Sequence, residues 1–89
     1  WTCIDTGDLQ RGNIDGSQVE NFITGLNRPD ELAIDEAAGK IYWTEHAGQC
    51  VGCIDRDGKN RRQILENLPS PVMGIGLDTT HGRIYVCLR

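Results

Sequence analysis

The sequence has few aromatic residues, no long apolar run and fewer basic than acidic residues. Aromatic side chains make up 6% of the 89 residues, and nine Lys and Arg face thirteen Asp and Glu, for a net charge of −4. The only adjacent basic pair is Arg61–Arg62, whereas binding to phosphate backbones requires clustered Lys and Arg, so we expect no nucleic-acid partner. No segment approaches the roughly 20 apolar residues of a membrane span, so no membrane insertion is expected.

Two further patterns are missing. The chain has no Asn-x-Ser/Thr glycosylation acceptor and no signal-peptide pattern, which leaves open a mature product, an excised piece or a cytosolic chain. What it does contain is eleven glycines, a composition that suits a β protein rich in turns. A chain of this length forms one small domain with a marginal core.

The chain contains an internal repeat of about 42 residues. Ile41–Glu45 (Ile-Tyr-Trp-Thr-Glu) returns in altered form at 84–87 (Ile-Tyr-Val-Cys), and Trp1–Cys3 aligns with Trp43–Glu45. Other matches 42 apart are Leu9/Val51, Asp15/Asp57, Gly16/Gly58, Leu26/Leu68 and Pro29/Pro71, and matches 43 apart are Asp35/Asp78, Gly39/Gly82, Lys40/Arg83 and Tyr42/Tyr85. This length suits one four-stranded unit. We therefore expect a single unit over 1–89, with repeat 1 at about 1–42, repeat 2 at about 43–85 and the start of a third at 86–89.

Each repeat contains segments with the composition of short β-strands. The aromatic and β-branched segment 39–44 follows a glycine turn, and 50–55 follows a short loop. Asp57–Gly58 and its counterpart Asp15–Gly16 are strong hairpin signals, because glycine supplies the positive φ that such turns require. The other expected strands are 9–14, 19–24, 31–34, 62–66, 73–77 and 84–87. Four short strands in hairpin order make one propeller blade, so the sequence predicts an all-β fold of two four-stranded antiparallel blades.

A helical alternative exists for one of these segments. Val19, Phe22, Ile23 and Leu26 have the i, i+3, i+4, i+7 spacing of an amphipathic helix over 18–26. Such a helix is shorter than the ~12–15 residues that are stable alone, and it would have to form in both repeats. We therefore favour the strand and keep the helix as the alternative.

The repeated segment resembles a known family. Tyr42-Trp43-Thr44-Glu45 is similar to the Tyr-Trp-Thr-Asp signature of the YWTD repeats in low-density-lipoprotein-receptor-type β-propellers, with Glu in place of Asp. The resemblance extends over essentially the whole chain and includes Val51, Cys53, Asp57, Gly58, Leu68, Pro71, Asp78 and Tyr85. Cys3 stands where the signature has Asp, and Val86 and Cys87 stand where it has Trp and Thr, so those positions lack the usual side chains.

The resemblance implies a six-bladed, extracellular and non-catalytic propeller that binds other proteins or peptides on one face of the disc. A blade has two broad apolar faces, and two blades alone leave two of these faces uncovered. The chain starts and ends inside the aromatic strand, which would allow one blade to be built from both termini. We therefore expect that either the residues belong to a longer chain or copies associate head to tail into a ring, with a homotrimer giving six blades.

The four cysteines occupy four different positions of the repeat. An even count in a short chain indicates an oxidising compartment. Cys3 and Cys87 lie near the two ends and form the expected seam disulfide, within a chain or between chains, with free buried thiols as the alternative. His46, Cys50 and Cys53 have zinc-like spacing, but residues three apart on a strand point to opposite faces, so no metal site is predicted.

Residues that differ between repeats at the same structural position are the candidates for ligand binding. Repeated residues such as Trp43 are expected to be scaffold, and variation at fixed positions is how a repeat protein makes a specific surface. Met73 offers adaptable apolar surface and Arg28 a directional donor. The candidate ligand-binding residues are Arg28, Asp30, Glu31, Glu45, His46, Ser70, Val72 and Met73.

The sequence therefore predicts a module that binds a protein or peptide on the hub face, without a cofactor. A purely structural pair of blades that assembles into a ring is the first alternative. A calcium-dependent hydrolase is the second, because some six-bladed propellers hold calcium at the hub and Glu31, Asp35 and Asp78 are acidic. Asp35 and Asp78 recur in both repeats, which favours a structural role in turns.

Overall fold

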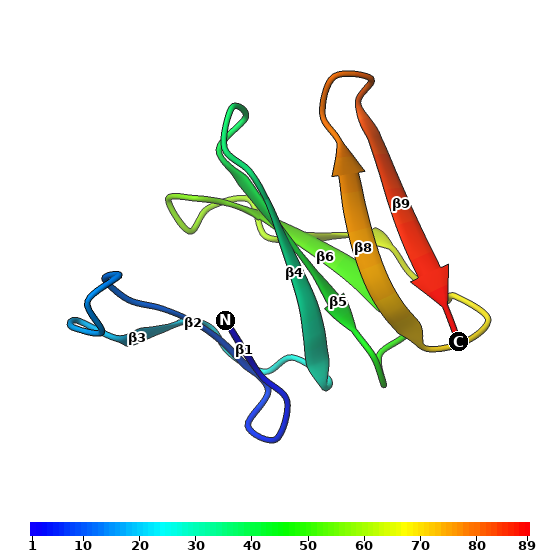
Figure 1. The fold of residues 1–89 in the computed structure, drawn as a ribbon. Coiled ribbons are helices and arrows are strands. Elements are labelled where there is room, and N and C mark those ends of the chain that lie inside the picture. The colour runs from blue at the N-terminus through cyan, green and yellow to red at the C-terminus, as the bar shows by residue number, and fades with distance from the viewer.

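The computed structural model describes all residues 1–89 and contains only strands and loops (Figure 1). The nine strands are β1 Thr2–Cys3, β2 Asp8–Arg11, β3 Glu20–Ile23, β4 Pro29–Asp35, β5 Lys40–Glu45, β6 Cys50–Asp55, β7 Arg62–Leu65, β8 Val72–Asp78 and β9 Arg83–Leu88. Every expected strand is present, so the all-β prediction is confirmed. The helical alternative for 18–26 is wrong, because β3 pairs along β2 and buries Ile23. No helix long and apolar enough to cross a membrane is found.

The strands form three antiparallel sheets arranged side by side. The orders are β1-β2-β3, β4-β5-β6-β7 and β8-β9. The central sheet is a complete four-stranded blade in hairpin order, as expected. The sheets are offset from the sequence repeats, because the strand that follows each proline pairs with the aromatic strand that opens the next repeat. Leu32 of repeat 1, for example, lies opposite Trp43 of repeat 2. Closure of a ring by association of copies stays a prediction.

The internal repeat is visible in the hydrogen bonds of the turns. In the β2–β3 turn the N–H of Asn13 donates to the carbonyl of Ser17 at 2.9 Å. In the β6–β7 turn the N–H of Asp55 donates to the carbonyl of Lys59 at 3.0 Å. These donors and acceptors are 42 residues apart. Left-handed backbone recurs as well, since Gly16 and Gly58 both have φ of 88°. The predicted Asp-Gly turns are thus the same structure formed twice.

The indole of Trp43 is the centre of the central blade. Trp43 is 1% exposed and lies directly over the backbone of Gly52, its cross-strand partner in β6. A Cβ atom at Gly52 would overlap the indole ring, so only glycine allows this approach. In the first sheet Gln10 takes the place of that glycine opposite Trp1, and Trp1 is 51% exposed.

The main core lies between the first sheet and the central blade. Its buried members are contributed by both: Leu9, Ile23, Leu26, Trp43 and Ile54, with Phe22, Leu32 and Ile41 packed against them. Only 14 of the 89 residues are buried, so a substitution in this cluster removes a large share of the packing.

The ends of the strands define two edges of the structure. At the entry edge lie the loops that lead into β4 and β8 (residues 24–28 and 66–71), the β1–β2 turn (4–7) and the β5–β6 loop (46–49). At the hairpin edge lie the β2–β3, β4–β5, β6–β7 and β8–β9 turns (12–19, 36–39, 56–61 and 79–82). In Figure 1 the entry edge is at the bottom, where β4 and β8 both begin.

We expect Gly52→Ala to destabilise the fold by about 1–3 kcal/mol, because the added methyl group must displace the Trp43 ring. Chemical denaturation followed by tryptophan fluorescence measures the change. Gly76→Ala is the matched control: it lies on β8 with nothing within 4 Å of its added Cβ. Equal stability of the two variants would contradict the contact.

Candidate ligand-binding edge

Most of the sequence-predicted ligand residues lie together at the entry edge. They lie at the starts of β4 and β8, which are neighbours in space, and in the β5–β6 loop. Arg28 and Glu31 are exposed, and Met73 is 43% exposed. Asp30, His46 and Ser70 are partly buried at the same edge. The structure therefore brings six of the eight candidates to one surface.

Backbone hydrogen bonds hold the loops of this edge in place. The N–H of His46 donates to the carbonyl of Arg28 at 2.8 Å, which joins the β5–β6 loop to the β3–β4 loop. The N–H of Leu68 donates to the carbonyl of Gln49 at 3.1 Å, and the equivalent Leu26–Gly7 bond is 2.9 Å. Arg28 has a positive φ of 56°, a strained conformation for a residue with a side chain. The edge is thus a rigid surface rather than a set of independent loops.

Two of the predicted residues are not at the surface. Val72 is fully buried and Glu45 is 7% exposed. The Glu45 carboxylate accepts the N–H of Asn27 at 2.8 Å, the indole N–H of Trp43 at 3.3 Å and the thiol of Cys50 at 3.2 Å. We therefore correct the assignment: Glu45 and Val72 support the edge from below, because a carboxylate already bound by three donors has little capacity for a ligand.

Glu45 joins two blades. Asn27 lies in the loop between the first sheet and β4, so its bond to Glu45 fixes the course of the chain from one blade to the next. The neighbouring Thr44 hydroxyl accepts the N–H of Glu31 at 2.9 Å, and the Thr2 hydroxyl of the first sheet donates to the carbonyl of Asp30 at 2.7 Å. The signature residues thus act on the backbone of the β4 entry.

The four cysteines are free thiols in the structure. Cys3 lies in the first sheet and Cys87 in β9 of the third, with the central blade between them (Figure 1). The expected Cys3–Cys87 bridge therefore does not form within one chain, and a bridge between chains stays a prediction. Cys50 and Cys53 are both buried. Burial and the Glu45 carboxylate raise the pKa of Cys50 to about 12.

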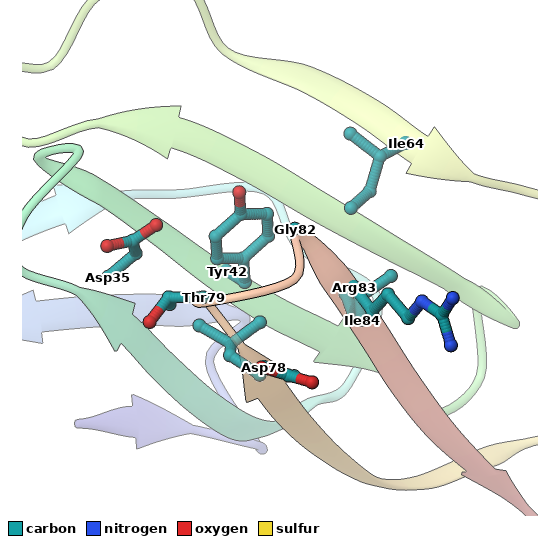
Figure 2. Close-up of a pocket in the computed structure, with 9 residues that line it drawn as sticks. Asp35, Tyr42, Ile64, Asp78, Thr79, Gly82, Arg83 and Ile84 are labelled. Atoms are coloured by element: carbon teal, nitrogen blue, oxygen red, sulfur yellow. The ribbon is translucent and has the colours of Figure 1, made fainter.

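A groove that the sequence did not predict lies between the central blade and the β8–β9 hairpin. Its volume is about 200 Å³. Figure 2 shows the Tyr42 ring pointing into it, with Thr79 of the β8–β9 turn nearby. Burial and the neighbouring Cys53 raise the pKa of the Tyr42 phenol. Most of the lining recurs in the repeat (Asp35, Tyr42, Asp78, Gly82, Arg83 and Ile84), which indicates packing between blades rather than a specific site.

The acidic residues considered for calcium do not form one cluster: Asp35 and Asp78 line the same groove, and Glu31 lies elsewhere. Glu31 lies near the start of β4 and Asp35 at its end. Asp35 accepts the N–H of Ala38 at 3.2 Å and Asp78 accepts the N–H of His81 at 3.3 Å, so each carboxylate stabilises its own turn. No group of three His, Cys, Asp or Glu side chains is placed to hold a metal ion.

Comparisons with known proteins agree with this fold. No family model matches the chain. The chain is 32% identical over 72 residues to the 3-hydroxyacyl-CoA dehydrogenase-like protein LAM1 of Cochliobolus heterostrophus. This match covers 73% of the chain and 15% of that protein. The chain is also 35% identical over 66 residues to low-density lipoprotein receptor-related protein 5 of Mus musculus. This match covers 72% of the chain and 4% of that protein.

The fold is also found in a solved structure. A β-propeller chain in the crystal structure of a nidogen/laminin complex superposes with a TM-score of 0.91 at 22% identity, over 99% of this chain and 35% of that one. The chain thus consists of β-propeller blades. Its repeats are of the YWTD type of low-density-lipoprotein-receptor-related proteins, as the sequence indicated. In each comparison it spans a minor part of the relative's length.

We expect Glu45→Gln to lower the free energy of unfolding by about 1–3 kcal/mol, because an amide nitrogen would face one of the three donors and leave it unsatisfied. Urea denaturation measures the loss. Glu31→Gln is the matched control at an exposed position on the adjoining strand. If both variants unfold at the same urea concentration as the parent chain, the carboxylate does not join the blades.

We expect Cys50 to resist alkylation by iodoacetamide at pH 8, because a thiol with a pKa of about 12 is almost entirely protonated there. Cys87 is exposed and serves as the internal control. Mass spectrometry of digested protein gives the rate at each cysteine. Rates that are equal at Cys50 and Cys87 would contradict the buried Cys50–Glu45 contact.

Proposed function

We propose that the chain is a non-catalytic binding module of an extracellular propeller that takes a protein or peptide ligand on the entry edge. One observation carries the proposal: the candidate residues in which the repeats differ at the entries to β4 and β8 lie at this edge, on loops held by a repeated hydrogen-bond framework. A rigid framework with variable side chains reduces the entropy lost on binding.

The chemistry of the edge supports a protein ligand. Met73 is an exposed, flexible apolar side chain on β8, and Arg28 offers a planar set of donors on the loop that leads into β4. An apolar side chain and an arginine on the same edge are typical of protein-binding surfaces, where arginine and adaptable apolar residues are enriched. Glu31 adds a carboxylate on the same strand as Asp30.

The comparisons support the same class of function. One matched relative is named as a receptor-related protein, and the superposed propeller comes from a complex of two proteins, nidogen and laminin. Another relative has a dehydrogenase-like name, but the match spans 15% of it. An extracellular setting for this chain follows from the receptor-type relatives and is part of the proposal.

We expect selected peptides to identify this surface. A phage-displayed peptide library is panned against the immobilised chain, and the affinity of a recovered peptide is measured by calorimetry. Met73→Glu and Arg28→Glu should each weaken binding by at least about tenfold, which corresponds to the loss of one hot-spot contact.

Arg83→Glu is the charge-matched control, because Arg83 is exposed at the start of β9, directly after the β8–β9 turn of the hairpin edge. Binding that is lost with Arg83→Glu and retained with Met73→Glu would place the ligand elsewhere. Failure of a well-folded chain to select any saturable peptide would favour the purely structural alternative.

A further inference from the structure

The β6–β7 turn carries a concentration of positive charge that the linear sequence shows only in part. Residues 56–62 contain Arg56, Lys59, Arg61 and Arg62 with a single acid, Asp57. This segment has a net charge of +3, so the other 82 residues of a chain with net charge −4 sum to −7. All seven residues are exposed. The charge of the molecule is thus strongly segregated.

The fold adds a fifth basic side chain to this turn. Arg11 of β2 donates through Nη1 to the carbonyl of Arg56 at 3.3 Å, although the two residues are 45 apart in sequence. Its guanidinium is also held by Glu20 at 2.7 Å and lies 4.2 Å from the centre of the Phe22 ring. Arg11 is therefore fixed in orientation beside the turn while half of its side chain stays exposed. We call Arg11, Arg56, Lys59, Arg61 and Arg62 the basic patch.

The hairpin itself does not require these charges. The β2–β3 turn of the first repeat forms the same hydrogen bonds, and both Asp15 and Asp57 accept an N–H two residues further along at 2.9 Å. In that repeat the positions of Lys59, Arg61 and Arg62 hold Ser17, Val19 and Glu20. The backbone bonds of the turn thus form without basic residues. Arg62 donates to the carbonyl of Asn60 at 2.6 Å and Arg61 to that of Thr24 at 3.4 Å, but neither contact requires four cations together, which points to a binding function.

A polar hollow lies next to the basic patch. It has a volume of about 390 Å³ and is lined by Arg11, Gly12, Asn13, Gln18 and Glu20, none of them hydrophobic. Amide, guanidinium and carboxylate groups supply both donors and acceptors for hydroxyl groups. A hollow of this kind suits a sugar ring, and the cations beside it suit sulfate groups.

We propose that the basic patch and this hollow bind a sulfated polysaccharide at the hairpin edge. The hairpin edge is opposite the one proposed for the protein ligand (Figure 1). The two edges touch at one point, where Arg61 donates to the carbonyl of Thr24 at 3.4 Å. A nucleic acid is a poorer fit because the patch offers no uncovered aromatic ring for base stacking, Phe22 being covered by Arg11. A flat lipid surface does not fill a hollow.

Heparin is the probe, and calorimetry in increasing NaCl measures its affinity for the full chain. The repeat-swap variant, Lys59→Ser with Arg61→Val and Arg62→Glu, installs the residues of the first repeat. It should weaken binding by at least about tenfold, because the release of counterions falls with each lost cation. A milder pair, Arg56→Gln with Lys59→Gln, should give an intermediate loss and guards against misfolding of the triple variant.

Arg83→Glu with Arg89→Glu is the control for net charge, since it also changes the charge by −4 and lies outside the patch. The proposal expects this control to bind heparin within about twofold of the parent chain, because binding that depends on local contacts is insensitive to distant screened charges. Equal losses in control and swap variants would overturn the proposal.

Three further ligands identify the chemistry. Desulfated heparin should not bind. Duplex DNA that binds as tightly as heparin would overturn the assignment to a polysaccharide in favour of general polyanion binding. Ile14 is fully exposed on the β2–β3 turn, so vesicles of phosphatidylserine and phosphatidylcholine are tested with the parent chain and Ile14→Ser. Vesicle binding that depends on Ile14 and exceeds heparin binding would assign the patch to a membrane surface instead.

Discussion

The structure depends on one buried arrangement, the Trp43 indole packed on the Gly52 backbone with the Glu45 carboxylate beside it. The indole needs a partner without a side chain, and its N–H needs an acceptor because a buried donor without one is costly. Glu45 supplies the acceptor and also binds the N–H of Asn27 in the chain entering the blade. Packing within one blade and the connection to the previous blade are thus a single interaction.

This arrangement separates structural from functional residues along the repeat. Positions that recur, such as Asp35 and Asp78, stabilise turns with their own backbone amides. Positions that differ, such as Met73 and Arg61, are exposed at opposite edges. In a repeat scaffold the recurring residues maintain the fold, and the residues that vary can differ in chemistry without disturbing it. One small chain can therefore present two chemically different surfaces.

The sequence predicted the strands and the gathering of six ligand candidates because both follow from period and strand alternation. It missed the burial of Glu45, since a charged residue next to a loop is normally exposed and only the fold shows three donors converging on it. Four members of the basic patch are close together in the sequence at 56–62, but the sequence could not show that Arg11 joins them. Arg11 reaches Arg56 only because β2 and the β6–β7 turn lie side by side, and a separation of 45 residues leaves no local pattern. The sequence also could not show the offset between sheets and repeats, because the pairing of strands depends on contacts between residues of different repeats.

Hydrogen exchange at one backbone amide tests the central arrangement most directly. The N–H of Asn27 lies in the loop between the first sheet and β4 and is bound by the Glu45 carboxylate. If Glu45 joins the blades, this amide exchanges slowly, at a rate set by unfolding of the sheets. Exchange as fast as that of the exposed amides in the β2–β3 turn would show that the blades are not joined in this way.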